Sequence, residues 1–532
     1  MPVPPSVTSA YNYPLLIKHL LVRSEGTCTG KELVTGLDTG FSYNTLFKRV
    51  CQLANSLETS CGHEGMRVGV MDWDTNRYLE CFFAIPMMGA TLFTINVRLS
   101  PYQILYSINH GKPDLIIVHQ DFMPIIDSIK SDFERDIIII PIGDGEGYEE
   151  WIGSASEIYE FPDFDENQTA TLFYTTGTTG NPKGVSYSHR QLVLHTLGLL
   201  AGFGAWPGNT GLHRRDVYMP LTPLFHVHGW GFPYAATMLG LSQVYPGKFE
   251  PDRILQLIAD KGVTFSHCVP TVLSMVLDHP KCSQTDLSSW KVIVGGASLP
   301  RGLQDRAAAE GISLHAAYGM SETCPFLTVA NLSSDDKEIQ AQTGFPGPLV
   351  DLRVVTPNME DVPRDGKTTG EIVARAPWLA QAYLDNVRDS EELWTGGYLH
   401  TGDVGYIRED GSFQITDRLK DVIKTGGEWI SSLHLESIAS SCDGVEDVAA
   451  IGLPHPKWGE RPVLVIQAPE HSDKELLSSR VLEKIQSRID AGELSKWAIP
   501  DELIFIDSLP KTSVGKLDKK LLRQNIISRS VY

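Results

Sequence analysis

The feature that most constrains the fold of this chain is an alternation of short β-branched runs with amphipathic segments. The runs are too short for an ordinary helix, and they occupy residues 68–73 (VGVMDW), 115–119 (LIIVH), 136–142 (DIIIIPI), 265–270 (FSHCVP) and 291–297 (KVIVGGA). Between them, segments such as 43–57 and 252–262 place apolar residues three and four positions apart, which is the spacing of one helix face. Strand, helix and strand in alternation predict an α/β fold with a mostly parallel sheet.

The pattern changes in the last third of the chain. From residue 350 onward, strand-like runs follow one another closely, with turn residues between LRVVTP, EIVARAP and SFQITDR. A βαβ-like pattern returns from residue 446 onward. The sequence therefore predicts a large N-terminal domain of α/β sheets with a β-rich subdomain, followed by a small α+β C-terminal domain.

Composition excludes several classes of protein. The chain has 532 residues, of which 42% are hydrophobic, and this is typical of packed soluble domains. A formal net charge of −20 argues against a general nucleic-acid binder, which needs a basic face. The eight cysteines include no CxxC pair, so they predict neither a zinc ribbon nor a disulfide framework and favour a cytoplasmic location. No signal peptide or membrane-spanning run is found in the sequence.

Residues 174–184 read YTTGTTGNPKG and follow a predicted strand. Glycines let backbone amides converge on an anion, threonine hydroxyls add donors and Lys183 adds a positive charge, so such a loop can bind phosphates. It is not a Walker A motif, because glycine rather than serine or threonine follows the lysine. Taken alone, the loop fits a phosphate site and a simple structural turn equally well.

Four further stretches decide between these two interpretations. They are PLFHVHGW (223–230), YGMSET (318–323), the segment from GYLHTGD to GGEWISS (397–432) and LPKTSVGKLDKK (509–520). With residues 174–184, they have the order and spacing of the adenylate-forming superfamily, which comprises acyl-CoA synthetases, peptide-synthetase adenylation domains and luciferases. The chain resembles this family over nearly its whole length. It is most similar to the fatty and medium-chain acyl-CoA synthetases, with which it shares MDWDTNRYLECFFAIPMMGA and GGEWISS.

The resemblance implies a two-step reaction on a small-molecule carboxylic acid. ATP first converts the acid to an acyl adenylate, and pyrophosphate leaves with Mg²⁺. The thiol of CoA, a co-substrate, then displaces AMP. In this family a large N-terminal domain, here residues 1–419, meets a mobile C-terminal domain, here 420–532, with Lys420 at the hinge.

On the nucleotide side, the resemblance implies that the loop binds the β- and γ-phosphates through Thr175, Thr176, Gly177, Thr178, Thr179, Gly180 and Lys183. Thr175 and Glu322 would be the Mg²⁺ ligands, because this hard cation prefers oxygen. Asp403 would accept both ribose hydroxyls, although an aspartate in TGD also suits a turn. Tyr318 would stack on adenine. The remaining implied nucleotide contacts are Ser321, Arg418, Lys424 and Trp429, of which the tryptophan also fits a core position.

On the acyl side, the resemblance places His226 between the carboxylate and the thiol channel, and Trp230 at the gate of the acyl tunnel. His226 and His228 lack a nearby third ligand, so a zinc site is rejected. Close relatives often have glycine before the tyrosine of YGMSET, where this chain has alanine, so Ala316 and Ala317 are expected to narrow or reshape the acyl pocket. The implied acid-binding positions are Gly296, Ala316, Ala317 and Gly319.

The C-terminal domain supplies one face for each half-reaction in the family. Lys516 would bridge the carboxylate and the α-phosphate during adenylation. After domain rotation, Gly426 and Gly427 would line a narrow passage for pantetheine, because they lack side chains. The CoA nucleotide would contact Lys457, Trp458 and Trp497.

The sequence leaves three points open: the acyl acceptor, the catalytic competence of the chain and its oligomeric state. The acyl acceptor could be an amine or a carrier-protein thiol instead of CoA, because the first half-reaction is the same. A silent nucleotide-binding scaffold is disfavoured by intact Lys516, Glu322 and Asp403. Assembly as a homodimer is the third open point.

Overall fold

The computed structural model describes residues 7, 9–21, 32–35, 39–143, 146–175, 181–206, 210–425, 428–491, 494–511 and 517–530. The chain forms two compact units that interleave along the sequence. The first contains Met1–Tyr174, Gly184–Leu200 and Pro223–Lys248, and the second contains Thr175–Lys183, Ala201–Thr222 and Phe249–Tyr532. The domain boundary at 419/420 falls inside the second unit and stays a prediction.

A six-stranded sheet is the centre of the first unit. Its strands lie in the spatial order β6 (Ile138–Ile142), β5 (Leu115–His119), β3 (Arg67–Met71), β4 (Thr91–Thr94), β7 (Thr169–Thr175) and β8 (Lys183–Ser188). Neighbours from β6 to β7 run parallel, and every residue of β4 and β5 is buried. Continuous burial explains why these strands read as unbroken apolar runs. The predicted α/β class is confirmed.

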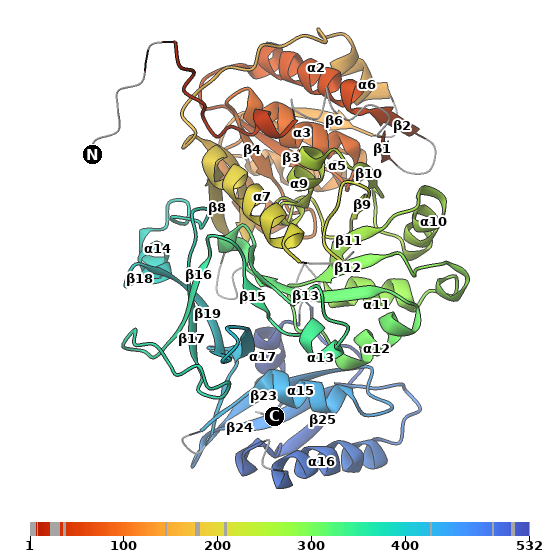
Figure 1. Ribbon diagram of the computed structural model, residues 1–532, viewed down its shortest axis with the longest axis vertical. Coiled ribbons are helices and arrows are strands. Elements are labelled where there is room, and N and C mark those ends of the chain that lie inside the picture. Colours follow the sequence, from red (N-terminus) through yellow and green to blue (C-terminus); the bar gives the residue numbers. More distant parts are fainter. Residues whose placement is uncertain are drawn as a thin grey trace. The chain divides into compact units, whose positions relative to one another are not determined.

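The helices of the first unit begin at side-chain caps that the sequence supplies. Ser42 accepts from the Thr45 amide at the start of α2 (Tyr43–Cys61), and Thr75 caps α3 (Asn76–Met87) in the same way. Ser100 and Gln103 form a capping box before α4 (Pro101–Gly111). α2 packs against α3 and α6 (Glu146–Gly153), as Figure 1 shows. The predicted helix over 43–57 is confirmed.

Further strands and helices belong wholly or partly to this unit. Strands β1 and β10 are parallel, and β1 and β2 are antiparallel. These elements are β1 (Glu32–Thr35), β2 (Thr39–Ser42), β10 (Ser242–Tyr245), α5 (Met123–Ile129), α7 (His189–Gly204) and α9 (Phe232–Leu239).

The second unit contains another parallel sheet. β9 (Val217–Pro220), β11 (Phe265–Cys268), β12 (Lys291–Val294) and β13 (Ser313–Gly319) run parallel, and β14 (Phe326–Val329) and β15 (Phe345–Pro346) continue the sheet antiparallel. α11 (Pro270–Leu277) contacts α10 (Pro251–Lys261) and α12 (Arg301–Ala309). The strands predicted within 265–270 and 291–297 are confirmed.

The predicted β-rich segment is also present. It forms an antiparallel sheet in the order β16 (Asp351–Val355), β17 (Gly370–Arg375), β19 (Tyr398–Ile407) and β18 (Trp394–Thr395), with β20 (Phe413–Arg418) paired to β19. The short helix α14 (Val387–Leu393) lies between β17 and β18, whereas α13 (Lys337–Gln340) lies between β14 and β15 of the preceding sheet.

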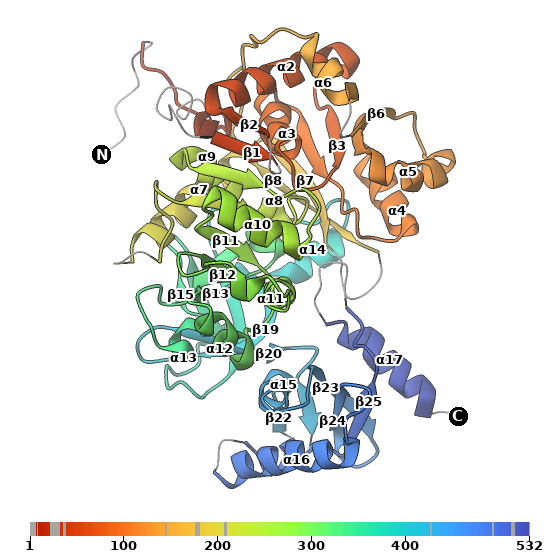
Figure 2. The ribbon, with the colours of Figure 1, turned by 90° about the vertical axis from the view of Figure 1, so that its right-hand side faces the viewer.

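The C-terminal segment buries both faces of one small sheet. In β23 (Asp447–His455), Val448 and Ala450 pack toward α15 (Ser432–Ser440) and α16 (Lys474–Asp490), whereas Ala449 and Ile451 pack toward α17 (Lys519–Ser530). Alternate side chains point to opposite faces of a strand, so the two helical layers lie on opposite sides, as α15 and α17 do in Figure 2. The other strands are β21 (Ile423–Thr425), β22 (Glu428–Ile430), β24 (Gly459–Gln467) and β25 (Glu502–Ile506).

Within the described ranges, no helix has the length and apolar character required to cross a membrane.

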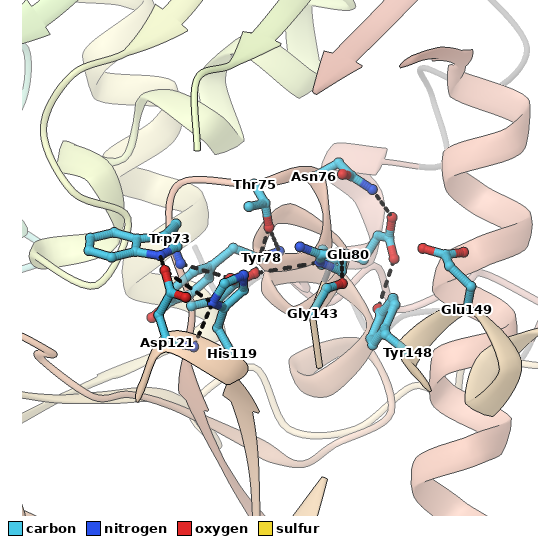
Figure 3. Close-up of polar contacts among 12 residues, drawn as sticks. Trp73, Thr75, Asn76, Tyr78, Glu80, His119, Asp121, Gly143, Tyr148 and Glu149 are labelled. Carbon is cyan, nitrogen blue, oxygen red and sulfur yellow. Dashed lines mark hydrogen bonds and ion pairs between the residues drawn. The ribbon is translucent and has the colours of Figure 1, made fainter. Parts of the chain in front are cut away.

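A buried carboxylate links three elements of the first unit. The Glu80 side chain in α3 is fully buried, and it accepts from Asn76 Nδ2 at 2.8 Å and Tyr148 Oη at 2.8 Å (Figure 3). It also accepts from Arg49 Nε at 2.7 Å. Arg49 also binds Glu149, whose side chain is half exposed. A buried charge is tolerated only with such partners, so this network fixes α2, α3 and α6 together.

We expect Glu80→Gln to lower the free energy of unfolding by about 2–4 kcal/mol, because it removes one charge of a buried pair and mismatches the donors around it. Glu149→Gln is the matched control and should cost less than about 1 kcal/mol, because its charge is solvated. Urea unfolding of both variants measures the difference, and equal losses would contradict the assignment of Glu80 as the fixing group.

Candidate functional site

Three residues predicted on the nucleotide side come together around Asp403. Asp403 in β19 is 3% exposed. Its Oδ2 accepts from the Tyr318 hydroxyl at 2.7 Å, and its Oδ1 lies 3.2 Å from Arg418 Nε. Residues 403 and 418 face each other in the β19–β20 register, and Tyr318 lies at the end of β13. The Asp403 carboxylate raises the pKa of Arg418, so the guanidinium stays charged.

The stacking of Tyr318 on adenine stays a prediction. The hydroxyl of this side chain is engaged with Asp403, and burial, followed by the neighbouring carboxylate, raises the pKa of Tyr318. The phenol is therefore neutral and acts as a hydrogen-bond donor to Asp403.

A second cluster surrounds Glu322, which lies in the short 3-10 helix η4 (Ser321–Thr323) together with Ser321. Glu322 is 7% exposed, and its Oε1 accepts from the Tyr383 hydroxyl at 2.7 Å. Lys183 Nζ lies 4.6 Å from the centroid of the Tyr383 ring and 2.6 Å from Asp389 Oδ2. One tyrosine thus connects the predicted phosphate lysine to the predicted metal carboxylate.

The pKa shifts of Asp389 and Tyr383 show which groups of this second cluster are charged and which are neutral. The hydrogen bond from Lys183 lowers the pKa of Asp389, so the Asp389 carboxylate is charged at neutral pH. Burial, reinforced by Glu322, raises the pKa of Tyr383, so its hydroxyl stays a donor. The cluster presents a cation and carboxylate oxygens, which are the groups that phosphates and a hard divalent cation require.

Tyr383 and Asp389 were missed by the sequence analysis. Both lie in residues 376–393, a stretch that carries none of the five motifs, and no local pattern marks them. Their contacts are visible only in the structure, where Tyr383 meets Glu322 in η4 and Asp389 meets Lys183 at the start of β8.

Most of the predicted phosphate loop lies outside the described residues. These positions are Thr176, Gly177, Thr178, Thr179 and Gly180. Thr175 is the last residue of β7 and is partly exposed, and Lys183 is the first residue of β8. The loop therefore connects two neighbouring strands of the same sheet, from the end of β7 to the start of β8.

The predicted acid-binding positions lie on or beside β12 and β13. Ala316 and Ala317 are in β13, and Gly296 follows β12 with a positive φ of 78°. Gly319 has no room for a side chain, because an added Cβ would lie 1.6 Å from the Pro325 carbonyl oxygen. The glycine of YGMSET is thus required by a close backbone approach.

The hinge prediction falls on a turn after β20. Lys420 is exposed there. Next to it, Asp417 is 1% exposed and accepts from the backbone amide of Ser432. The hinge role of Lys420 stays a prediction.

The residues predicted to bind the CoA nucleotide are brought together. The rings of Trp458 and Trp497 are 4.7 Å apart between centroids, and Lys457 Nζ lies 4.4 Å from the Trp458 ring. Arg461 donates to the Trp497 carbonyl at 3.0 Å and to Thr425 Oγ1 at 3.2 Å. This aromatic and cationic cluster therefore lies beside the end of β21.

Three further predicted residues and one predicted side chain lie outside the described part of the chain. Gly426, Gly427 and Lys516 lie outside the described residues, as does the side chain of Trp429, whose backbone pairs with Lys424 between β22 and β21.

On the acyl side, His226 precedes the short helix α8 (Val227–Trp230), and Trp230 is 5% exposed. The backbone from 227 to 231 has five consecutive positive φ angles of 46°, 57°, 55°, 60° and 76°. Left-handed backbone costs about 1–2 kcal/mol for each residue with a side chain, and a β-branched valine is especially unfavourable there. The segment that carries the predicted acyl residues is therefore strained.

His228 lies inside this strained segment and is fully buried. Four rings surround it at centroid distances of 5.3–6.4 Å, from Phe82, Phe173, Tyr187 and Tyr234. Burial lowers the pKa of His228 to about 3, so the imidazole is neutral. Among the described residues, no group of three or more His, Cys, Asp or Glu is placed to hold a metal ion.

These features define an α/β enzyme of the adenylate-forming class. The family model described as AMP-binding enzyme matches residues 22–384, and the model described as AMP-binding enzyme C-terminal domain matches residues 434–516. The chain belongs to the AMP-binding enzyme family, as its motifs predicted.

Characterised relatives match the chain along nearly its whole length. A long-chain-fatty-acid–CoA ligase of Thermus thermophilus is 36% identical over 93% of this chain and 92% of the relative. A medium-chain-fatty-acid–CoA ligase of Ectopseudomonas oleovorans is 34% identical over 93% of both chains. A 3-methylmercaptopropionyl-CoA ligase of Ruegeria lacuscaerulensis is 34% identical over 96% of this chain and 97% of the relative. The predicted enzyme class, an AMP-forming acid–thiol ligase, is confirmed by these relatives.

Solved structures have the same fold. ATP-bound MatB from Rhodopseudomonas palustris superposes with a TM-score of 0.83 at 26% identity, over 95% of this chain and 98% of that chain. The anthranilate CoA ligase AuaEII with anthranoyl-AMP superposes with a TM-score of 0.87 at 24% identity, over 97% of this chain and 98% of that chain.

We expect Tyr318→Phe to lower the free energy of unfolding by about 1–3 kcal/mol, because it removes a donor from a nearly buried carboxylate. Tyr406→Phe serves as the control: Tyr406 lies on β19, the strand that carries Asp403, and its hydroxyl accepts from Arg408 at 3.2 Å. That change should cost less than about 1 kcal/mol. Urea unfolding distinguishes them, and an unchanged midpoint for Tyr318→Phe would show that the bond to Asp403 is dispensable.

Proposed function

We propose that this chain is an ATP-dependent fatty-acid–CoA ligase that acts on medium- or long-chain carboxylic acids. The observation that carries the proposal is the similarity, across more than nine tenths of the chain, to relatives named as CoA ligases for long-chain and medium-chain fatty acids. ATP as the nucleotide is supported by the AMP-binding family match and by the likeness to ATP-bound MatB.

The chemistry requires two steps. A carboxylate does not react with a thiol, because oxide is too poor a leaving group. Attack of the carboxylate on the α-phosphate of ATP forms an acyl adenylate and releases pyrophosphate. The thiolate of CoA then attacks the acyl carbon, and AMP leaves with both electrons of the broken bond. Negative charge builds on the phosphates in the first step, so the protein must supply donors and cations there.

For the nucleotide, we assign Asp403 to the ribose hydroxyls and Lys183 to the phosphates. The burial of Asp403 between Tyr318 and Arg418 supports a fixed carboxylate. The position of Lys183 over the Tyr383 ring, next to Glu322, supports a phosphate site with a cation beside it. Ser321, Lys424 and Trp429 complete the proposed nucleotide contacts.

The proposed Mg²⁺ ligands fit a hard cation by their chemistry. Glu322 offers a carboxylate with one oxygen bonded to Tyr383, and Thr175 offers a hydroxyl at the end of β7. Mg²⁺ bound there would neutralise charge on the phosphates.

For the acid and the thiol, we assign His226 and Trp230 to the carboxylate side and the acyl chain, and Lys516 to adenylation. Gly296, Ala316, Ala317 and Gly319 line the proposed acid site. Gly426 and Gly427 form the proposed pantetheine passage, and the ring pair of Trp458 and Trp497 beside Lys457 supports a CoA nucleotide contact. A mobile domain over 420–532 with its hinge at Lys420, a cytoplasmic location and a homodimer stay predictions from the sequence.

The direct test incubates the protein with ATP, Mg²⁺ and straight-chain acids from butyrate to stearate, with and without CoA, and identifies products by mass. We expect acyl adenylate without CoA and acyl-CoA with it, greatest for medium or long chains. In parallel reactions, amino acids or a carrier protein take the place of CoA as the acyl acceptor. Acyl transfer to these acceptors but not to CoA would overturn the CoA-ligase assignment.

Lys516→Ala and Gly427→Leu should separate the two half-reactions. We expect Lys516→Ala to reduce acid-dependent pyrophosphate release by orders of magnitude while a presynthesised acyl adenylate still reacts with CoA at a near-parental rate, because the lysine acts only in the first transition state. Gly427→Leu should do the reverse, because its side chain obstructs the thiol passage. Equal loss of both steps in both variants, with unchanged melting profiles, would contradict the use of alternate faces.

A further inference from the structure

Three side chains of the first unit contact the backbone and ring of two adjacent residues in the acyl segment. Asp74 Oδ1 accepts from the Leu224 amide at 2.7 Å. Thr94 Oγ1 donates to the Phe225 carbonyl at 3.0 Å, and the Arg98 guanidinium carbon lies 5.8 Å from the centroid of the Phe225 ring. We call Asp74, Thr94 and Arg98 the loop clamp.

The loop clamp is itself firmly anchored. Asp74 follows β3, and its carbonyl accepts from the Gly247 amide at 2.8 Å. Thr94 ends the fully buried strand β4 and is 1% exposed. The Arg98 amide donates to Asn96 Oδ1 at 2.9 Å. Groups placed by buried parallel strands have little freedom to move, so they can impose a position on the segment they contact.

The segment that follows needs such a constraint. The five left-handed residues 227–231 begin two residues after Phe225, and the His226 amide donates to the Pro223 carbonyl at 2.9 Å. Strained backbone persists only where the surroundings over-determine it. Packing of aromatic rings on His228 constrains the strained residues 227–231 themselves, and the loop clamp constrains Leu224 and Phe225, which precede them.

We propose that Asp74, Thr94 and Arg98 are positioning residues that hold segment 223–231 in the conformation in which His226 and Trp230 receive the acid. The inference rests on the proposed function, because it assigns the acid to this segment. The loop clamp would then set the affinity for the acid and leave the affinity for ATP unchanged.

The charge of Asp74 should make the affinity for the acid depend on pH. The titratable or charged groups that interact with it are Arg98, Asp72, Tyr78 and Tyr245. Burial raises the pKa of Asp74 to about 7, against opposing effects of the Leu224 amide and Arg98. Below pH 7 the carboxyl is protonated, and its bond to Leu224 loses charge assistance, which roughly halves the strength of such a bond. The acid should therefore bind more weakly as pH falls from 8 to 6.

The test compares Asp74→Ala, Asp74→Asn and Thr94→Val with the matched control Asp121→Ala. Asp121 lies near Trp73 and accepts from its Nε1 at 2.8 Å (Figure 3). Steady-state pyrophosphate release with dodecanoate gives KM for the acid, KM for ATP and kcat. We expect Asp74→Ala to raise the acid KM about tenfold or more and Thr94→Val to raise it about threefold, with the ATP KM unchanged.

Asp74→Asn keeps an oxygen acceptor for the Leu224 amide but cannot ionise. Its acid KM should match that of the parent at pH 6, should lie below that of Asp74→Ala, and should stay constant between pH 6 and 8, whereas the acid KM of the parent falls about fivefold as the pH rises over this range. An acid KM in Asp74→Ala equal to that of Asp121→Ala, or equal increases in the KM values for acid and ATP, would overturn the proposal.

A second readout does not depend on activity. Hydrogen–deuterium exchange of the Leu224 amide should be faster in Asp74→Ala and near parental in Asp74→Asn and Asp121→Ala. If the parent protein releases no pyrophosphate with any acid, the proposed function fails, and the exchange rates alone decide whether the loop clamp exists. Parental exchange in Asp74→Ala would reject it.

Discussion

Buried carboxylates that accept hydrogen bonds from other elements determine the geometry of this chain. Glu80, Asp403 and Glu322 are each less than a tenth exposed, and each accepts from at least one tyrosine hydroxyl. Removing a carboxylate from water costs several kcal/mol unless donors replace the lost solvent. Each acid therefore constrains segments that are far apart in the sequence, and the clusters around Asp403 and Glu322 are built in this way.

The same principle connects the fold to the reaction. Adenylation concentrates negative charge on phosphates, so the protein must keep cations and donors in place before the substrate arrives. Arg418 is held by Asp403, and Lys183 is held by Asp389. In the first unit, Asp74 accepts from a backbone amide instead, and the segment that it contacts is strained. Acidic side chains thus fix cations and backbone in place within each unit.

Much of the fold and part of the site were predictable from sequence. Apolar runs bounded by turn residues identified parallel strands such as β5 and β12, because burial on both faces removes polar residues. The motifs also identified Tyr318, Asp403 and Arg418, and the structure joins these three. Tyr383, Asp389 and Asp74 carry no local pattern that identifies their roles. A single tyrosine or aspartate has the same appearance in a loop as in a site, and only the contact distinguishes them.

The sequence by itself determined the α/β class and the family, because both are written in local periodicity and in the order of short motifs. The tertiary structure alone decided which groups meet: the side chains of Glu322 and Tyr383, the side chains of Lys183 and Asp389, and the Asp74 carboxylate with the Leu224 amide. These pairs are separated by 61, 206 and 150 positions along the chain. Side-chain pairing at such separations depends on how whole elements pack, because no local interaction constrains two residues that are so far apart.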